Sequence, residues 1–392
     1  MQSDDRDYYC RNKFNNIKID LESFTTYTCH AARPHTIDFE WLHKNPGQIF
    51  NSPVNVLERT QMLRNERNSS CEQNCWPAED RASPSPRLIS KGQFRTHTDI
   101  ISQAEIVDIT LNSDCGLTCS YCCKEFSSSW RNDIIKNGNY DIDSERDRYS
   151  LTQRDLIINR LSQPERINSQ SIKQMIDEIN KISSTAKKLI ISGGEPFLSK
   201  YLVDVVEKKS HVPKIQIFTG LGVDYKRFQR IIDVLADHKN VVIYVSAEST
   251  GSCYEFNRYG MRWDDFLRKM ELLEKKNMQI GLSSVMSNLT VLGFADFYRM
   301  FDNKKIRIEC VYNPNFLAPH VLDPNTKQIV MQQIDSIDFA KKQIILDSMN
   351  SNPTQQEHRD LAKFLHEFVR RRHGLTLDCF PKTFQNWVKN VV

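Results

Sequence analysis

From about residue 100 onward, short apolar runs alternate with longer stretches whose apolar residues recur at helical spacing. Short apolar runs predict buried strands, and repeated strand–helix units predict a parallel sheet covered by helices. The predicted strands are Ile106–Leu111, Leu189–Ser192, Lys214–Thr219, Val241–Ser246, Met278–Met286 and Lys305–Val311. The predicted helices are Ser169–Ser183, Lys200–Lys209, Asp224–His238, Trp263–Lys276 and Val291–Phe301, and Ser127–Asp155 is a polar insertion. The pattern therefore predicts an α/β domain over residues 96–320.

The two ends of the chain have different patterns. Residues 1–95 predict a small cysteine-rich α+β module, which a Ser/Pro-rich linker at Ser83–Pro86 separates from the sheet. Residues 321–392 predict a helical tail. The elements predicted in these two regions are strand Asn15–Leu21, its hairpin partner Thr25–Cys29, and helices Val54–Asn65, Thr326–Met349 and Thr354–Arg372.

Composition and charge narrow the class of protein. The chain has 392 residues, of which 39% are hydrophobic and 26% charged, so it can bury a substantial core. A net charge of +4 gives no strong signal for nucleic acid. No apolar run is long enough to span a bilayer, and the N-terminal residues do not have the pattern of a signal peptide. The predicted location is the cytoplasm. Eleven cysteines in a cytoplasmic chain favour metal ligation over disulfides.

Three cysteines follow the first predicted strand at a CxxxCxxC spacing. They are Cys115, Cys119 and Cys122, on a loop that Asp114 and Gly116 make flexible enough to turn. Such a loop can bring three thiolates to one soft-metal centre. Three ligands are one fewer than a closed zinc or iron–sulfur site takes, so one metal position stays open. The alternatives are a zinc knuckle or three unconnected buried cysteines.

A glycine-rich turn, Gly193-Gly194-Glu195-Pro196, follows the second predicted strand. The glycines allow the backbone to approach a ligand, and the carboxylate before a stiff proline provides a fixed acceptor. A GGEP stretch alone could be only a turn. Its place one strand and one helix after the cysteine loop makes the combination specific.

Together these stretches resemble the radical S-adenosylmethionine (SAM) enzymes, whose signature is CxxxCxΦC with an aromatic Φ, here Tyr121. The resemblance implies a [4Fe–4S] cluster on the three cysteines, with SAM chelating the fourth iron. Reduction of the cluster would cleave SAM to methionine and a 5′-deoxyadenosyl radical that abstracts hydrogen from substrate. The resemblance also implies a partial (β/α)6 TIM barrel and binding of the SAM methionyl amino group by the GGEP turn.

Further residues at strand ends are expected to contact SAM, because ligands of such barrels gather at the C-terminal ends of the strands. Thr219, followed by Gly220, ends the third predicted strand and stands where the family often has a turn beside SAM. Ser246 and Glu248 follow the fourth strand, where polar side chains of the family reach the SAM ribose or carboxylate. A solvated helix cap is the alternative for Glu248.

The N-terminal cysteines Cys10, Cys29, Cys71 and Cys75 resemble the SPASM/twitch module of some radical SAM enzymes. The resemblance implies a second, auxiliary [4Fe–4S] cluster with four protein ligands. The module usually follows the barrel, whereas here it precedes it. A zinc site with four cysteine ligands, or a structural Cys71/Cys75 pair alone, are the alternatives.

Two further cysteines are candidate hydrogen-atom donors. Cys310, near the end of the sixth predicted strand, and Cys253, just beyond the fourth, have positions from which some radical SAM epimerases return a hydrogen atom to the product radical. Buried or incidental thiols are the alternative.

The combined prediction is a radical SAM enzyme that modifies a ribosomally made peptide. Epimerisation, crosslinking and thioether formation are the reactions associated with this architecture, and a reductant such as flavodoxin or ferredoxin is the expected partner. Modification of a sugar, nucleotide or other small metabolite is one alternative. A non-catalytic iron–sulfur or zinc protein is the other, although that class needs neither the GGEP turn nor an open metal position.

Overall fold

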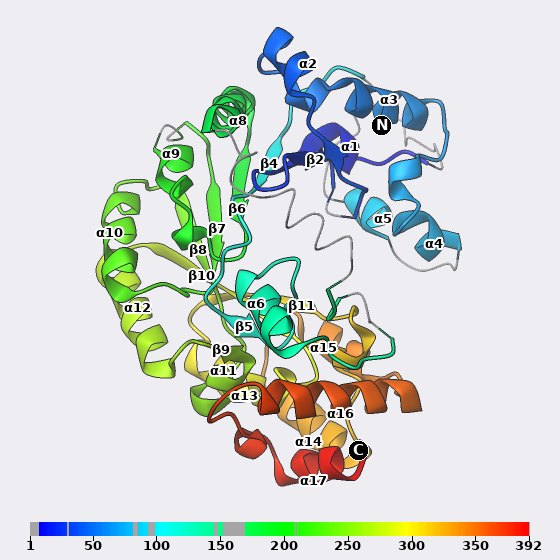
Figure 1. Cartoon of the computed structure of the whole chain (residues 1–392), viewed down its shortest axis with the longest axis vertical. Helices are drawn as coiled ribbons and strands as arrows, with labels where there is room; N and C mark the ends of the chain where they lie inside the picture. The colour runs from blue at the N-terminus through cyan, green and yellow to red at the C-terminus, as the bar shows by residue number, and fades with distance from the viewer. Residues whose placement is uncertain are drawn as a thin grey trace. The chain divides into compact units, whose positions relative to one another are not determined.

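The computed structural model describes residues 8–29, 31–80, 85–92, 99–144, 148–151, 169–207, 209 and 211–391 (Figure 1). Two residues of the predicted linker, Ser83 and Pro84, lie outside these described residues. None of the helices in the described parts of the chain has the length and hydropathy of a membrane span.

Nine strands of the described residues form a sheet in the order β11-β10-β8-β7-β6-β4-β1-β2-β3. Its pairings β1–β4, β4–β6, β6–β7, β8–β10 and β10–β11 are parallel, while β1–β2 and β2–β3 are antiparallel. The strands are β1 Asn16–Asp20, β2 Thr25–Tyr27, β3 His35–Thr36, β4 Ile106–Thr110, β6 Lys188–Ser192, β7 Ile215–Thr219, β8 Val241–Ser246, β10 Gln279–Met286 and β11 Lys305–Cys310. The α/β class and all six predicted strands are confirmed, and the barrel closure stays a prediction.

The chain divides into two compact units. The first comprises Met1–Asn112, Leu161–Ile217 and Asp237–Val241; the second comprises Ser113–Arg160, Phe218–Ala236 and Val242–Val392. The N-terminal residues are part of a larger unit because β1 pairs with β4 along its whole length, from Asn16 opposite Ile106 to Asp20 opposite Thr110.

The first unit covers its part of the sheet with short helices. The predicted hairpin is confirmed, since Lys18 of β1 pairs with Tyr27 of β2. Helix starts have the expected chemistry: the Asp38 side chain accepts from Trp41 N, and Ser85 accepts from Leu88 N before Pro86 at the first helical position. The helices are α1 Asn12–Asn15, α2 Phe39–Lys44, α3 Pro53–Leu63, α4 Cys75–Asp80, α5 Pro86–Ser90, α8 Ser169–Ile182 and α9 Leu202–Val206, with 3₁₀ turns η1 Ile49–Asn51, η2 Ser69–Cys71, η3 Ser183–Thr185 and η4 Pro196–Leu198.

The second unit holds the remaining helices and a separate two-stranded sheet, in which β5 (Thr118–Cys119) pairs antiparallel with β9 (Arg258–Tyr259). A capping box at Thr354 and Glu357 begins its longest helix. The helices are α6 Ser128–Asn137, α10 Tyr225–Leu235, α11 Gly251–Asn257, α12 Trp263–Lys275, α13 Phe294–Met300, α14 Pro324–Asp335, α15 Lys342–Met349, α16 Gln355–Arg370 and α17 Lys382–Val391, with 3₁₀ turns η5 Val291–Gly293, η6 Asn315–Leu317 and η7 Leu377–Cys379.

One predicted helix needs correction. The stretch Thr326–Met349 is not continuous but forms α14 and α15, with an irregular segment between them. Within that segment Ile337 is buried, and the Asp338 carbonyl accepts a hydrogen bond from the Tyr298 hydroxyl at 2.8 Å. These tertiary contacts lie at the break in the local helical pattern.

Candidate active site

The predicted cluster loop lies in the second unit, immediately before and through β5. Cys119 is buried, whereas Cys115 and Cys122 are half-buried. In each pair of these thiols, the sulfurs are close enough for a negative charge on one to act on the other. The loop therefore brings the three sulfurs together. That the three cysteines bind one metal centre stays a prediction.

Two segments distant in sequence fix the backbone of this loop. Cys119 stands opposite Arg258 in the β5–β9 ladder, and Ser120 N donates to the Asn257 carbonyl at 2.8 Å. The Ser120 hydroxyl also bonds Oδ1 of Asn257 at 2.7 Å. From α6, the indole N–H of Trp130 donates to the Cys119 carbonyl at 3.0 Å. The middle cysteine is thus held from both sides.

A layer of aromatic side chains supports the loop from α6 and α16. Trp130 is fully buried, and its ring lies 5.9 Å from Phe368 and 6.3 Å from Phe364. Arg372 packs its guanidinium 3.6 Å from the Phe368 ring centre and donates to Oγ1 of Thr118 at 3.0 Å. The C-terminal helices therefore help to build the loop, a role that their amphipathic pattern did not predict.

The donor set fits an iron–sulfur cluster. Burial raises the pKa of Cys119 to about 12 and that of Cys122 well above its usual range, so without a cation these groups stay neutral thiols. Iron supplies the positive charge that stabilises buried thiolates. Hydrogen-bond donors already face two of the sulfurs: Leu117 N lies 3.4 Å from Sγ of Cys115, and Nη1 of Arg258 lies 3.9 Å from Sγ of Cys119.

An ion pair that sequence analysis missed lies beside Cys119. Arg258 donates from Nε to Oε2 of Glu248 at 3.0 Å and from Nη2 to Oε1 at 2.6 Å. The Tyr121 hydroxyl donates to Oε1 of Glu248 at 2.8 Å and accepts from Arg258 Nη2. Glu248 is fully buried and therefore is not a solvated cap. Two of the predicted SAM-contacting residues, Tyr121 and Glu248, thus share one buried network.

The other strand-end residues of the second unit have local roles in the turns that follow β7 and β8. Thr219 is buried, and its hydroxyl accepts from Leu221 N at 2.9 Å, which stabilises Leu221 at a φ of 58°. The buried ammonium of Lys269 donates to the Leu221 carbonyl at 2.9 Å. Ser246, the last residue of β8, is half-buried and pairs in register with Ser283.

The GGEP turn lies in the first unit, at the end of β6. Gly194 N donates to the Asn112 carbonyl at 2.8 Å, and Gly193 has a φ of 149°. Glu195 is 1% exposed, and its Oε1 accepts from Phe197 N at 3.1 Å, so the carboxylate begins η4 at Pro196. The turn is therefore a fixed local structure that holds its carboxylate in one position.

The structure brings the four N-terminal cysteines together in the first unit. Cys10, Cys71 and Cys75 belong to one buried cluster that also contains Phe14 and Trp76. The charges that the four thiols, Cys29 included, would carry act on one another in every pairing. Burial raises the pKa of Cys10, and it raises the pKa of Cys29 to about 11.

A buried lysine lies beneath these cysteines. Lys13 is 1% exposed, donates to the Ser70 hydroxyl at 2.8 Å and forms an ion pair with Glu58, which also bonds His35 at 2.9 Å. Burial raises the pKa of Cys10 and Cys29, and the positive charge of Lys13 offsets part of that rise. Four thiols with a buried cation nearby are suited to a centre that carries excess negative charge.

The two candidate hydrogen donors have different surroundings. The Cys253 thiol donates to the Cys379 carbonyl at 2.7 Å, which ties α11 to η7. Cys310, at the end of β11, is half-buried with its sulfur 4.0 Å from the Ile344 carbonyl. Cys123, next to the cluster loop, is fully buried.

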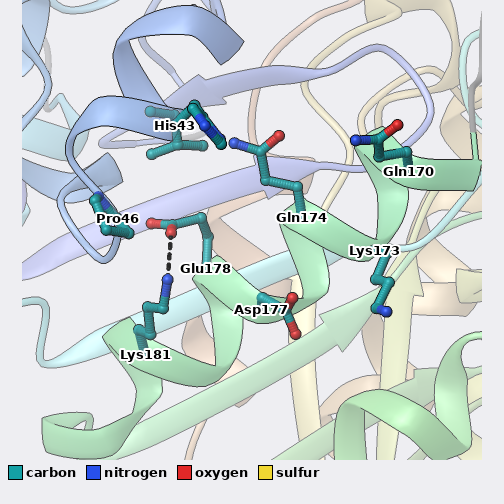
Figure 2. Close-up of a pocket in the computed structure, with 9 residues that line it drawn as sticks. His43, Pro46, Gln170, Lys173, Gln174, Asp177, Glu178 and Lys181 are labelled. Atoms are coloured by element: carbon teal, nitrogen blue, oxygen red, sulfur yellow. Dashed lines mark hydrogen bonds and ion pairs between the residues drawn. The ribbon is translucent and has the colours of Figure 1, made fainter.

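A cavity of about 320 Å³ in the first unit lies between α2 and α8 (Figure 2). Figure 2 shows His43 and Gln174 directed toward one another, with Glu178 and Lys181 paired beside Pro46. None of the predicted site residues lines this cavity. It is therefore separate from the chemistry that the cysteines indicate.

Among the described residues, no three or more His, Cys, Asp or Glu side chains are arranged to hold a metal ion. A [4Fe–4S] cluster makes a different demand, because each thiolate binds its own iron and the ligands surround a larger centre.

One part of the chain is similar to a known protein family. Residues 109–301 match the family model of the Radical SAM superfamily. No curated protein matches the chain. The segment that contains β6, β7, β8 and β10 is therefore similar to a radical SAM domain, and the match does not specify a reaction.

Solved structures that align with the chain include anSMEcpe with bound AdoMet, at 14% identity and a TM-score of 0.36, covering 67% of this chain and 57% of that one. Streptococcus suis SuiB bound to precursor peptide SuiA aligns at 14% identity and a TM-score of 0.33, over 64% and 56% of the two chains. The chain thus spans less than two thirds of the length of these relatives.

Proposed function

We propose that Cys115, Cys119 and Cys122 hold a catalytic [4Fe–4S] cluster whose open iron binds SAM. The observation that carries this proposal is the three-thiol loop itself, held between β9 and α6 with donors directed at two of its sulfurs. When bound, the cluster supplies the electron that cleaves SAM reductively. The protein holds the thiolates in place and shields them from water.

We further propose that Gly193, Gly194, Glu195 and Pro196 bind the methionyl end of SAM. The fixed turn and the buried Glu195 carboxylate support this role. Thr219, Ser246 and Tyr121 are also proposed to contact SAM. Both oxygens of Glu248 are bonded to Arg258, so its proposed contribution passes through that guanidinium and Tyr121.

A second [4Fe–4S] cluster on Cys10, Cys29, Cys71 and Cys75 is the proposed cofactor of the N-terminal module. The support is the burial of these thiols together and the donors near them, such as Ala31 N at 3.5 Å from Sγ of Cys29. A fully ligated cluster cannot bind SAM, so its proposed role is to relay an electron or to bind substrate.

The proposed substrate is a ribosomally made peptide, because the resemblance of the N-terminal cysteines to the SPASM/twitch module is associated with peptide modification. A sugar, nucleotide or other small metabolite is the competing substrate class. The proposed reductant is a flavodoxin or ferredoxin, and the proposed location is the cytoplasm, where oxygen-labile clusters are protected.

The test is release of 5′-deoxyadenosine from SAM by anaerobically reconstituted, dithionite-reduced protein. The parent protein should release it, and Cys119→Ala should abolish release because one iron loses its ligand. Cys123→Ala is the matched control: it removes a buried thiol next to the loop but outside the motif, and release should persist. Release by Cys119→Ala at the parent rate would contradict the cluster assignment.

A further inference from the structure

The buried Arg258–Glu248 ion pair is oriented with its guanidinium toward Cys119. Arg258 binds Glu248 through Nε and Nη2, while its third nitrogen, Nη1, lies 3.9 Å from Sγ of Cys119. The guanidinium therefore stands between the carboxylate and the sulfur. The positive charge of the pair is therefore nearer to Cys119 than the negative charge.

The backbone leaves this arrangement little freedom. Arg258 is the β9 residue directly opposite Cys119 in β5, and Asn257 before it makes two hydrogen bonds to Ser120. Gly260 then turns away at a φ of 106°, and a Cβ there would stand 2.9 Å from the Gly116 carbonyl oxygen. The guanidinium and the cysteine loop are thus parts of one small structure.

Burial makes the charges effective. The side chains of Arg258 and Glu248 are 4% and 0% exposed, so solvent screens neither of them. One-electron reduction adds a negative charge to a thiolate-bound cluster. A nearby cation and an N–H···S hydrogen bond both stabilise the reduced form and raise the reduction potential.

We propose that Arg258 is a positioning residue that raises the reduction potential of the catalytic cluster through the sulfur of Cys119, and that Glu248 holds and partly offsets its charge. This inference rests on the proposed function, because it requires the cluster on Cys115, Cys119 and Cys122. A role in folding alone would not give the two members of the pair opposite effects on the cluster.

The experiment measures the midpoint potential of the cluster by EPR-monitored titration of the full chain, on the signal that responds to added SAM. Arg258→Gln leaves a carboxylate near the cluster and removes the N–H donor, so the potential should fall. Glu248→Gln leaves the guanidinium unopposed, so the potential should rise. Arg371→Gln is the control: its side chain is 1% exposed and paired with Asp133 and Glu367, and the potential should stay at the parent value.

Opposite shifts in the two variants, at parent iron content, support the inference. Parent potentials in both overturn it, as does a fall in both. If Arg258→Gln does not retain iron, Arg258→Lys keeps the positive charge but draws the N–H donor away from Cys119, so the potential should fall. A parent potential in this variant also overturns the inference. A parent protein without any SAM-responsive signal overturns the proposed function itself, which distinguishes the two failures.

Discussion

Gly193 lies so close to Asn112 that a Cβ on the glycine would stand 2.5 Å from the Asn112 carbonyl oxygen. The same carbonyl accepts the hydrogen bond from Gly194 N, so the approach is part of the GGEP turn. A side chain here would separate the ends of β4 and β6. The first glycine of the motif is therefore required by packing within the protein as well as by any ligand.

Gly193→Ala should destabilise the turn and weaken SAM binding. The φ of 149° alone costs about 1–3 kcal/mol for a residue with a Cβ, and the clash adds to it. Thermal unfolding and isothermal titration with SAM would measure the two effects. Gly374→Ala is the control, because Gly374 also has a positive φ, 75°, but a Cβ there meets nothing within 4 Å. Equal loss of stability and SAM binding in both variants would contradict the close-approach argument.

Trp130→Phe should lower the free energy of unfolding slightly, because an aromatic ring still fills the space between α6 and α16. The change removes the N–H that donates to the Cys119 carbonyl, at a cost of about 1 kcal/mol. Trp130→Ala should cost about 3–5 kcal/mol, because it also leaves a cavity among buried rings. Denaturant unfolding measures both losses. A phenylalanine variant as unstable as the alanine variant would show that packing around the ring is not retained.

The double variant Cys71→Ala/Cys75→Ala should lose about four iron per chain, the content of one [4Fe–4S] cluster. It should retain the other cluster, which cleaves SAM to 5′-deoxyadenosine. Elemental analysis of reconstituted protein gives the count. Cys253→Ala/Cys379→Ala removes another pair of neighbouring cysteines and should keep the parent iron content. Unchanged iron together with lost zinc in the first variant would establish a structural zinc site instead.

Features encoded locally could be predicted from the sequence. The bounds of β8, Val241–Ser246, are those that the apolar run indicates, and the hairpin of β1 and β2 follows from alternation and spacing. The cysteine loop could be found because its three cysteines lie within eight residues. Periodicity and motif spacing act over such short distances, so a single sequence is sufficient to reveal them.

Features made by distant segments could not be predicted. Arg258 is 139 residues from Cys119 in the chain, and two-residue strands such as β5 and β9 have no periodicity to detect. The pairing of β1 with β4 likewise joins segments about 90 residues apart, so the N-terminal residues resembled a separate module. In the break between α14 and α15, the Asp338 carbonyl accepts a hydrogen bond from Tyr298, a contact that local helix preference does not include.

The most direct test of the central claim is iron and sulfide analysis with low-temperature EPR of anaerobically reconstituted, dithionite-reduced protein, with and without SAM. We predict about eight iron per chain and two cluster signals, one of which SAM shifts. About four iron with the same shift would keep the catalytic cluster and remove the N-terminal one. A reduced cluster whose spectrum does not change with SAM would contradict the assignment of Cys115, Cys119 and Cys122 as the ligands of a SAM-binding centre.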